Sequence, residues 1–128
     1  MNSDIQVNIP EKDSNYTIYI DDAPVEELKS KILEITGDTN YLVVINNRVN
    51  KLYAKKLGFD KKKILVIPDG EKEKNFNNYN KILERLESEK ISRKGYVIAI
   101  GGGVIGDMAG FAAATYKRGI GLIQVPTT

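Results

Sequence analysis

Short apolar runs alternate with amphipathic stretches along most of this chain. The apolar runs have the length and continuity of strands that are buried on both faces of a parallel sheet. They are residues 41–45, 64–67 and 96–100, and residues 122–125, which include the polar Gln124, are expected to form a final strand. In the stretches between them, apolar residues recur every three or four positions, as on one face of a helix. These stretches are residues 49–57, 76–86 and 107–116. Strands and helices in alternation predict an α/β fold with a mostly parallel sheet and helices on both faces.

The N-terminal part of the chain predicts a β-hairpin. Apolar and polar residues alternate in 5–9 and again in 16–20, and the polar segment 10–15 separates the two. Alternation with a period of two is typical of a strand with one buried face, so we expect two antiparallel strands joined by that segment.

The helices are expected to begin and end at recognisable residues. Asp21 and Asp22 can cap a helix that has Pro24 in its first turn and ends at Gly37, and Asn46 can cap the next helix. The apolar positions that we expect to face the sheet are Val25, Leu28, Ile32 and Ile35 in the first helix, Val49, Leu52, Tyr53 and Leu57 in the second, and Phe76, Tyr79, Leu83 and Leu86 in the third.

A glycine-rich turn follows the apolar run 96–100. Gly101, Gly103 and Gly106 have the spacing G-x-G-x-x-G between a strand and a helix of small residues. The first turn of a helix has N–H groups without a partner, and glycine lets an anion approach them, so this junction predicts a phosphate or pyrophosphate site. The alternative is a tight turn without a ligand. No Asp or Glu follows Asp107, so the acid that holds a ribose hydroxyl in the common dinucleotide motif must come from elsewhere.

A candidate binding segment follows each of the predicted parallel strands. These segments are residues 46–47, 69–74, 101–107 and 127–128. The carboxyl ends of parallel strands share one edge of the sheet, and ligands bind beyond that edge, so we expect a single site there. We expect Asp107 in the first turn of its helix, where a carboxylate suits the helix dipole.

Composition narrows the class of function. The chain has 128 residues, 41% of them hydrophobic, which is enough for one domain with a core. Its formal net charge of +2 is too small to indicate nucleic-acid binding. There is no long apolar run and no signal-like start, so we expect a cytoplasmic protein without membrane contact. His and Cys are both absent, which leaves no histidine base and no usual zinc site.

Two long motifs resemble those of the 3-dehydroquinate synthases, NAD-dependent members of the sugar-phosphate cyclase superfamily. One is residues 101–119 (GGGVIGDMAGFAAATYKRG) with 123–128 (IQVPTT), and the other is 68–74 (PDGEKEK), similar to the family's D-G-E-x-x-K segment. The resemblance covers the whole chain in order, but only the first part of the family's length. It implies a Rossmann-like NAD-binding domain over residues 1–128, in a truncated chain from which the family's C-terminal helical metal-binding domain is absent.

The resemblance also implies roles for individual residues. Backbone N–H groups of 102–105 would bind the NAD pyrophosphate, Glu71 and Lys74 would hold the adenosine ribose, and Arg118 would bind the substrate phosphate, in the site of a partner subunit. The cofactor-binding residues expected in this way are Asn46, Asp69, Gly70, Glu71, Lys74, Gly102, Gly103, Val104, Ile105, Gly106, Asp107, Thr127 and Thr128.

Structural alternatives exist for several of these residues. Asn46 can be a helix cap without any contact to the cofactor. Asp107 can likewise be no more than an acid at the start of a helix. Glu71 and Lys74 can be surface charges at the start of a helix. Arg118 can be the cation that commonly lies near the C-terminal end of a helix.

The family reaction implied is that of a lyase of the shikimate pathway, which serves chorismate and aromatic amino acid biosynthesis. It converts DAHP to 3-dehydroquinate and phosphate in a homodimeric enzyme with NAD and a divalent metal, zinc or cobalt. The family's metal site of one Glu and two His lies beyond this chain, so we expect no catalytic residue and no metal ligand here, and no activity of the chain alone.

Three other functions remain open from the sequence. The first is another sugar-phosphate cyclase, of the 2-deoxy-scyllo-inosose or aminodehydroquinate synthase type. The second is a nucleotide-binding module without catalysis. The third is a member of the iron-type alcohol dehydrogenase and glycerol dehydrogenase group, which shares the architecture but is disfavoured by the pattern of residues 107–119.

Overall fold

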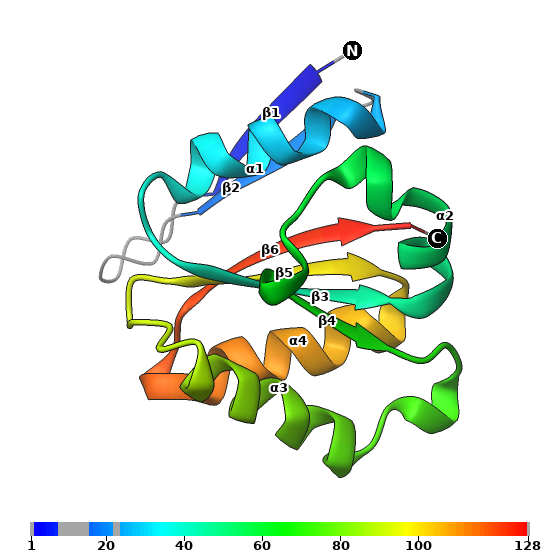
Figure 1. Cartoon of the computed structure of the whole chain (residues 1–128). Helices are drawn as coiled ribbons and strands as arrows, with labels where there is room; N and C mark the ends of the chain where they lie inside the picture. The colour runs from blue at the N-terminus through cyan, green and yellow to red at the C-terminus, as the bar shows by residue number, and fades with distance from the viewer. Residues whose placement is uncertain (1, 8–15, 22–23, 128) are drawn as a thin grey trace.

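A four-stranded parallel sheet forms the centre of the protein, which we describe from a computed structural model (Figure 1). The structure describes residues 2–7, 16–21 and 24–127. The strands of the sheet are β3 (Tyr41–Asn46), β4 (Ile64–Ile67), β5 (Tyr96–Gly101) and β6 (Gly121–Pro126), and their order across the sheet is β4-β3-β5-β6. All neighbouring strands in this sheet run parallel, which confirms the predicted α/β class.

The predicted hairpin forms a separate two-stranded sheet. β1 (Asn2–Val7) pairs antiparallel with β2 (Tyr16–Asp21), so that Asn2 faces Asp21 and Val7 faces Tyr16. The segment 8–15 that was expected to join the strands, including Ile9, lies outside the described residues.

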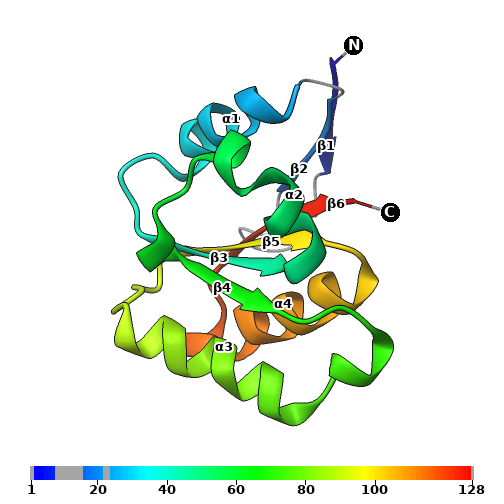
Figure 2. The same ribbon diagram turned by 45° about the vertical axis from the view of Figure 1, so that its right-hand side comes forward.

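Helices cover both faces of the parallel sheet, in two layers (Figures 1 and 2). α1 (Leu28–Thr36) and α2 (Asn47–Leu57) pack on one face, where Val43, Ile45, Ile98 and Ile100 are buried with Ile32, Leu57 and Phe59. α3 (Phe76–Ser88) and α4 (Gly103–Thr115) pack on the other face, against Leu42, Val44, Val97 and Ala99. Four single turns of 3₁₀-helix complete the described part: η1 (Val25–Glu27), η2 (Lys61–Lys63), η3 (Glu71–Glu73) and η4 (Tyr116–Arg118). Among the described residues, no helix has the length and apolar character needed to cross a bilayer.

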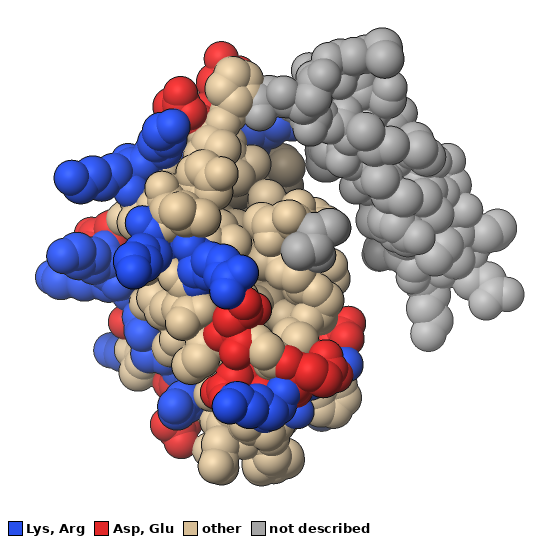
Figure 3. All heavy atoms as spheres, turned by 90° about the vertical axis from the view of Figure 1, so that its right-hand side faces the viewer, with Lys and Arg blue, Asp and Glu red and all other residues tan. Residues whose placement is uncertain are grey.

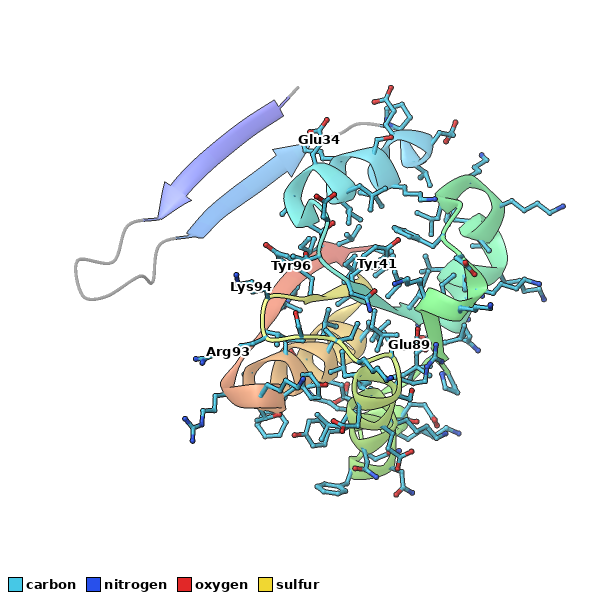
Figure 4. The ribbon with its side chains drawn as sticks, turned by 60° about the vertical axis from the view of Figure 1, so that its left-hand side comes forward. Glu34, Tyr41, Glu89, Arg93, Lys94 and Tyr96 are labelled. Carbon is cyan, nitrogen blue, oxygen red and sulfur yellow. The ribbon has the colours of Figure 1, made fainter. Side chains whose placement is uncertain are left out.

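The order of the strands reverses between β3 and β5. From β3 the chain steps to β4 on one side, then returns across β3 to build β5 and β6 on the other side. Such a reversal opens a crevice at the carboxyl ends of the two central strands, where ligands bind in open parallel sheets. Here those ends are Asn46 and Gly101. Tyr41 and Tyr96 are paired at the opposite, amino ends of the same strands (Figure 4).

Burial differs from the expected pattern at the margins of the sheet. β4 was expected to be buried on both faces, but it is an edge strand, and Val66 is 41% exposed. In α2, Leu52 was expected to face the sheet and is 66% exposed. At 100° per residue, Leu52 lies about 140° around the helix from the buried Leu57, so the two cannot share a face. Tyr53 and Phe76 were likewise expected inside and are exposed.

Two helix starts also differ from prediction. Asp21 is the last residue of β2 and Asp22 is outside the described residues, so Asp21 does not cap the first helix. The chain enters that helix through η1, and Pro24 is the extended residue before this turn rather than part of it. α4 begins at Gly103, four residues earlier than the expected start at 107, because the glycine turn itself provides its first turn.

The hydroxyl of Tyr116, just after α4, is hydrogen-bonded to two carbonyls at and beyond the end of α3. The Tyr116 side chain is 7% exposed, and its hydroxyl lies 3.2 Å from the Leu86 carbonyl and 3.1 Å from the Ile91 carbonyl. We expect Tyr116→Phe to lower the free energy of unfolding by about 1 kcal/mol, since a buried carbonyl loses its donor. Urea denaturation measures this. Tyr53→Phe, at an exposed tyrosine, should leave stability unchanged; equal effects of the two substitutions would contradict the assignment.

Candidate functional site

The glycine turn presents free backbone donors at the crevice. β5 ends at Gly101, and Gly102 precedes α4 without any side-chain cap. Within the described part of the chain, no hydrogen-bond acceptor meets the N–H groups of residues 103–105. A Cβ at Gly101 would lie 2.8 Å from Cγ1 of Ile105, so close packing requires glycine there. Gly103 faces open space, since beyond its chain neighbours and the backbone of its own helix no heavy atom lies within 4 Å of a Cβ at that position. The turn therefore leaves both donors and room for an anion.

Two hollows flank the glycine turn. The first, of about 270 Å³, is lined by Asn46, Pro68, Asp69, Gly70, Glu71, Gly102, Gly103, Val104 and Ile105. The second, of about 280 Å³, is lined by Ala99, Gly101, Gly102, Gly103, Gly106, Asp107, Gln124, Val125 and Pro126. The expected convergence of the strand ends at one edge is confirmed. The N–H of Thr127 donates to the Gly101 carbonyl at 3.0 Å, which places Thr127 beside the turn, while Thr128 lies outside the described residues.

Lys74 connects the segment after β4 to α4. Its ammonium donates to the Asp107 carboxylate at 2.8 Å and lies 3.7 Å from a Glu71 carboxylate oxygen. The hydrogen bond to Asp107, with the negative charges of Asp107 and Glu71, raises the pKa of Lys74 above its usual value, so the amine is charged at neutral pH. Acidic and basic side chains accordingly lie together on the face where the strands end (Figure 3).

Asp107 occupies a different place in its helix from the one predicted. Because α4 starts at Gly103, Asp107 is in the second turn, and no acidic residue lies in the first. The position of this carboxylate is therefore explained by its hydrogen bond to Lys74 and not by the helix dipole. Gly106 packs closely against β6, since a Cβ there would lie 3.1 Å from the Gln124 side chain. Gly110 is less crowded, at 3.6 Å from Leu122.

Asn46 is a helix cap, which was one of the two alternatives for it. Its side-chain oxygen accepts hydrogen bonds from the N–H groups of Arg48 and Val49, and its nitrogen donates to Asp69 at 2.8 Å. Arg48 lies 3.8 Å from the other oxygen of Asp69. Asn46 and Asp69 thus join the ends of β3 and β4 next to the glycine turn.

Arg118 does not reach the glycine turn within this chain. It follows the far end of α4, whose 13 residues span about 20 Å. Lys117 and Arg118 are both exposed and both have positive φ, at 48° and 65°. Two consecutive left-handed residues other than glycine are strained, which marks this turn as a functional candidate separate from the crevice.

Sequence reasoning missed several residues at this edge. The two hollows are also lined by Pro68, Ala99, Gln124, Val125 and Pro126, and Arg48 lies against Asp69. Their positions at or just beyond strand ends are the signal that could have identified them, because every strand end of a parallel sheet meets the same crevice.

Comparison with known proteins identifies the family. Residues 64–128, which include the glycine turn and the segment 68–74, match the family described as 3-dehydroquinate synthase N-terminal. The chain belongs to the 3-dehydroquinate synthase family. A 3-dehydroquinate synthase of Campylobacter hominis is 44% identical over 97% of this chain and 35% of its own length. That of Clostridium acetobutylicum is 38% identical over 90% of this chain and 34% of its own length. The chain thus spans about a third of the length of the curated 3-dehydroquinate synthases it matches.

Solved structures of sugar-phosphate cyclases have the same fold as this member of the 3-dehydroquinate synthase family. A 2-deoxy-scyllo-inosose synthase complexed with carbaglucose-6-phosphate, NAD⁺ and Co²⁺ is 26% identical with a TM-score of 0.68, over 98% of this chain and 35% of that one. The 2-epi-5-epi-valiolone synthase of Streptomyces hygroscopicus, with NAD⁺ and Zn²⁺ bound, is 27% identical with a TM-score of 0.63, over 70% and 28%. A probable glycerol dehydrogenase of Sinorhizobium meliloti, at 15% identity, over 78% and 26%, and a TM-score of 0.56, shares the fold alone.

Proposed function

We propose that this chain binds NAD at the glycine turn and forms the cofactor-binding part, residues 1–128, of a 3-dehydroquinate synthase. The observation that carries the proposal is the row of unpaired N–H groups at residues 103–105, which opens on the crevice between β3 and β5. Unpaired donors and the positive end of a helix dipole together favour a diphosphate.

The two hollows suit a dinucleotide rather than a single phosphate. They meet at Gly102 and Gly103, and each is near the lower limit of about 300 Å³ for ligand pockets. With the pyrophosphate at the glycine turn, one nucleoside would enter each hollow. Glu71 in the first hollow is then the acid that can accept hydrogen bonds from the adenosine ribose, beside Lys74. Asp107, which lines the second hollow, and Thr127, which is hydrogen-bonded to Gly101 beside it, would border the second nucleoside, and Thr128 follows in sequence.

The residues of this chain position the cofactor and do not carry out the later steps. NAD, when bound, would supply the reversible oxidation and later reduction of a substrate hydroxyl group. The chain's part is to fix the pyrophosphate by backbone N–H groups and the ribose by a carboxylate. We propose the family reaction, from DAHP to 3-dehydroquinate and phosphate, for the whole protein, with Arg118 binding the substrate phosphate in the partner subunit of a homodimer.

A divalent metal does not fit the residues that the structure describes, which form no group of three or more possible ligands. The sequence has no His and no Cys. The carboxylates of the crevice already have partners, since Asp69 accepts from Asn46, and Lys74 pairs with both Glu71 and Asp107. We therefore assign zinc or cobalt binding to the part of the longer family members that this chain does not match.

We expect the purified chain not to form 3-dehydroquinate. Without histidine it has neither the usual base for proton transfer near neutral pH nor the family's metal ligands. Release of phosphate from DAHP is measured in the presence of NAD with zinc or cobalt, against a reaction without protein. Measurable product above that blank would contradict the division of roles proposed above.

We expect Glu71→Ala to weaken NAD binding about tenfold, since hydrogen bonds to a charged group are worth roughly 1.5–3 kcal/mol. Glu71 is 80% exposed, so its removal should leave the fold intact. Calorimetric titration with NAD at millimolar concentration measures the effect. Glu84→Ala is the matched control, since Glu84 is an exposed carboxylate on α3 that lines neither hollow. Equal NAD affinity of wild type and Glu71→Ala would remove Glu71 from the ribose role.

A second candidate function is that of another sugar-phosphate cyclase. A 2-deoxy-scyllo-inosose synthase matches this chain with a TM-score of 0.70 but at 26% identity, against 44% for the first 3-dehydroquinate synthase above. Product analysis with DAHP and with glucose 6-phosphate, carried out on the full-length protein, separates the two functions.

A further inference from the structure

One buried amide lies where three parts of the crevice meet. Asn46 is the last residue of β3 and is 8% exposed. Its oxygen accepts the N–H groups of Arg48 and Val49 at 2.8 and 3.2 Å, and its nitrogen donates to Asp69. Three of the four hydrogen-bonding positions of the amide are thus used inside the protein. Little of this side chain is left to contact a ligand.

Asp69 links Asn46 by hydrogen bonds to the segment that contains Glu71. The oxygen that accepts from Asn46 also accepts the N–H of Gly70 at 3.1 Å. Gly70 has φ of 112°, a conformation that few other residues adopt, and η3 begins directly after it. The orientation of the Asp69 carboxylate therefore sets the direction in which the chain leaves β4.

The glycine turn touches the same amide residue. A Cβ at Gly101 would lie 3.1 Å from the Cβ of Asn46, so the backbone of β5 packs directly on this side chain. Asn46 is consequently fixed from three sides: by the start of α2, by Asp69 and by Gly101.

We propose that Asn46 is a positioning residue, which holds the Asp69–Gly70 turn, and with it Glu71, at a fixed place relative to the glycine turn. This inference rests on the proposed function, in which Glu71 and the glycine turn hold two parts of one cofactor. The hydrogen bond between residues 46 and 69 requires one amide as donor and one carboxylate as acceptor. A carboxylate at position 46 would still cap α2, but it would face the Asp69 carboxylate across a distance of 2.8 Å without a donor.

Exchange of the two side chains tests the pair directly. Asn46→Asp should weaken NAD binding at pH 8 by tenfold or more. The double variant Asn46→Asp with Asp69→Asn restores one donor and one acceptor between the two side chains without changing net charge, but the N–H of Gly70 loses the oxygen that accepts it. Its affinity should therefore lie clearly above that of Asn46→Asp and below that of wild type. Because two facing carboxylates share a proton readily, the affinity of Asn46→Asp relative to wild type should also recover as the pH falls towards 5.

A ligand-free measurement keeps the inference separate from the proposed function. In Asn46→Asp, amide hydrogen exchange at Gly70, Glu73 and Lys74 should be about tenfold faster than in wild type. The double variant should slow it again at Glu73 and Lys74, whose N–H groups donate to backbone carbonyls. Asp60→Asn is the control, since Asp60 caps η2 away from the crevice and should change neither exchange there nor NAD affinity.

The outcomes are distinct. Absence of NAD binding by wild type overturns the proposed function, and the exchange rates then still decide whether Asn46 holds the turn. Wild-type affinity and exchange in Asn46→Asp overturn the positioning role alone. So does a double variant that stays as weak as the single one.

Discussion

Gly103→Ala is expected to abolish most NAD binding without loss of stability. The new methyl group would project into the open space that both hollows share, where the pyrophosphate must approach the backbone closely. A loss of at least tenfold in affinity corresponds to about 1.4 kcal/mol. Alanine at this first helical position should meanwhile keep or slightly raise the free energy of unfolding, since glycine is the poorer helix former by up to about 1 kcal/mol.

Gly110→Ala is the matched control for this experiment. It adds the same methyl group to the same helix, but at a place where a Cβ meets Leu122 at an ordinary distance of 3.6 Å. We expect its NAD affinity to be close to that of wild type and its free energy of unfolding to stay the same or rise slightly, for the same reason of helix propensity. If Gly103→Ala bound NAD as tightly as Gly110→Ala, the ligand could not lie at the glycine turn.

Gly95→Ala is expected to have the largest effect on stability. Gly95 is buried, and a Cβ there would lie 2.4 Å from Cγ2 of Ile91 and 2.9 Å from the carbonyl oxygen of Asn40. That carbonyl accepts the N–H of Tyr96 where β3 and β5 begin to pair, so it cannot move without loss of that hydrogen bond. We expect the free energy of unfolding to fall by about 3 kcal/mol, the upper part of the usual range for overpacked sites.

Urea denaturation of Gly95→Ala and Gly103→Ala side by side measures this effect. Both substitutions add one methyl group to a glycine, and only the first places it against backbone and core atoms. A fall of less than about 1 kcal/mol in Gly95→Ala would show that the Asn40 carbonyl and Ile91 can move aside, contrary to the packing described above.

The central strands could be predicted from sequence because burial on both faces leaves a continuous apolar run. Residues 41–45 and 96–100 are of this kind, and β3 and β5 lie at the centre of the sheet. Residues 64–67 are equally apolar, yet β4 is at the edge. Composition reports that a strand is apolar, whereas its place in the sheet depends on how the chain crosses between strands, which no single segment encodes.

The site was partly predictable for the same kind of reason. The parallel sheet brings strand ends together, so Asn46, the segment 69–71 and the glycine turn could be expected at one edge. The contacts between side chains could not be foreseen. Lys74 and Asp107 are 33 residues apart, and their pairing depends on the direction of the chain after Gly70. Asp107 was expected near the helix dipole because the first residue of α4 was placed too late.

The most direct test of the central claim is a titration of the isotope-labelled chain with NAD, followed through the backbone N–H signals. We predict that the signals of Gly103, Val104 and Ile105 shift together and saturate with one dissociation constant, because their N–H groups have no acceptor among the described residues and open on the crevice. Signals of Gly58, at the far end of α2, should stay in place. If millimolar NAD left the signals of residues 103–105 unchanged, or shifted those of another region instead, the glycine turn would not be a diphosphate site.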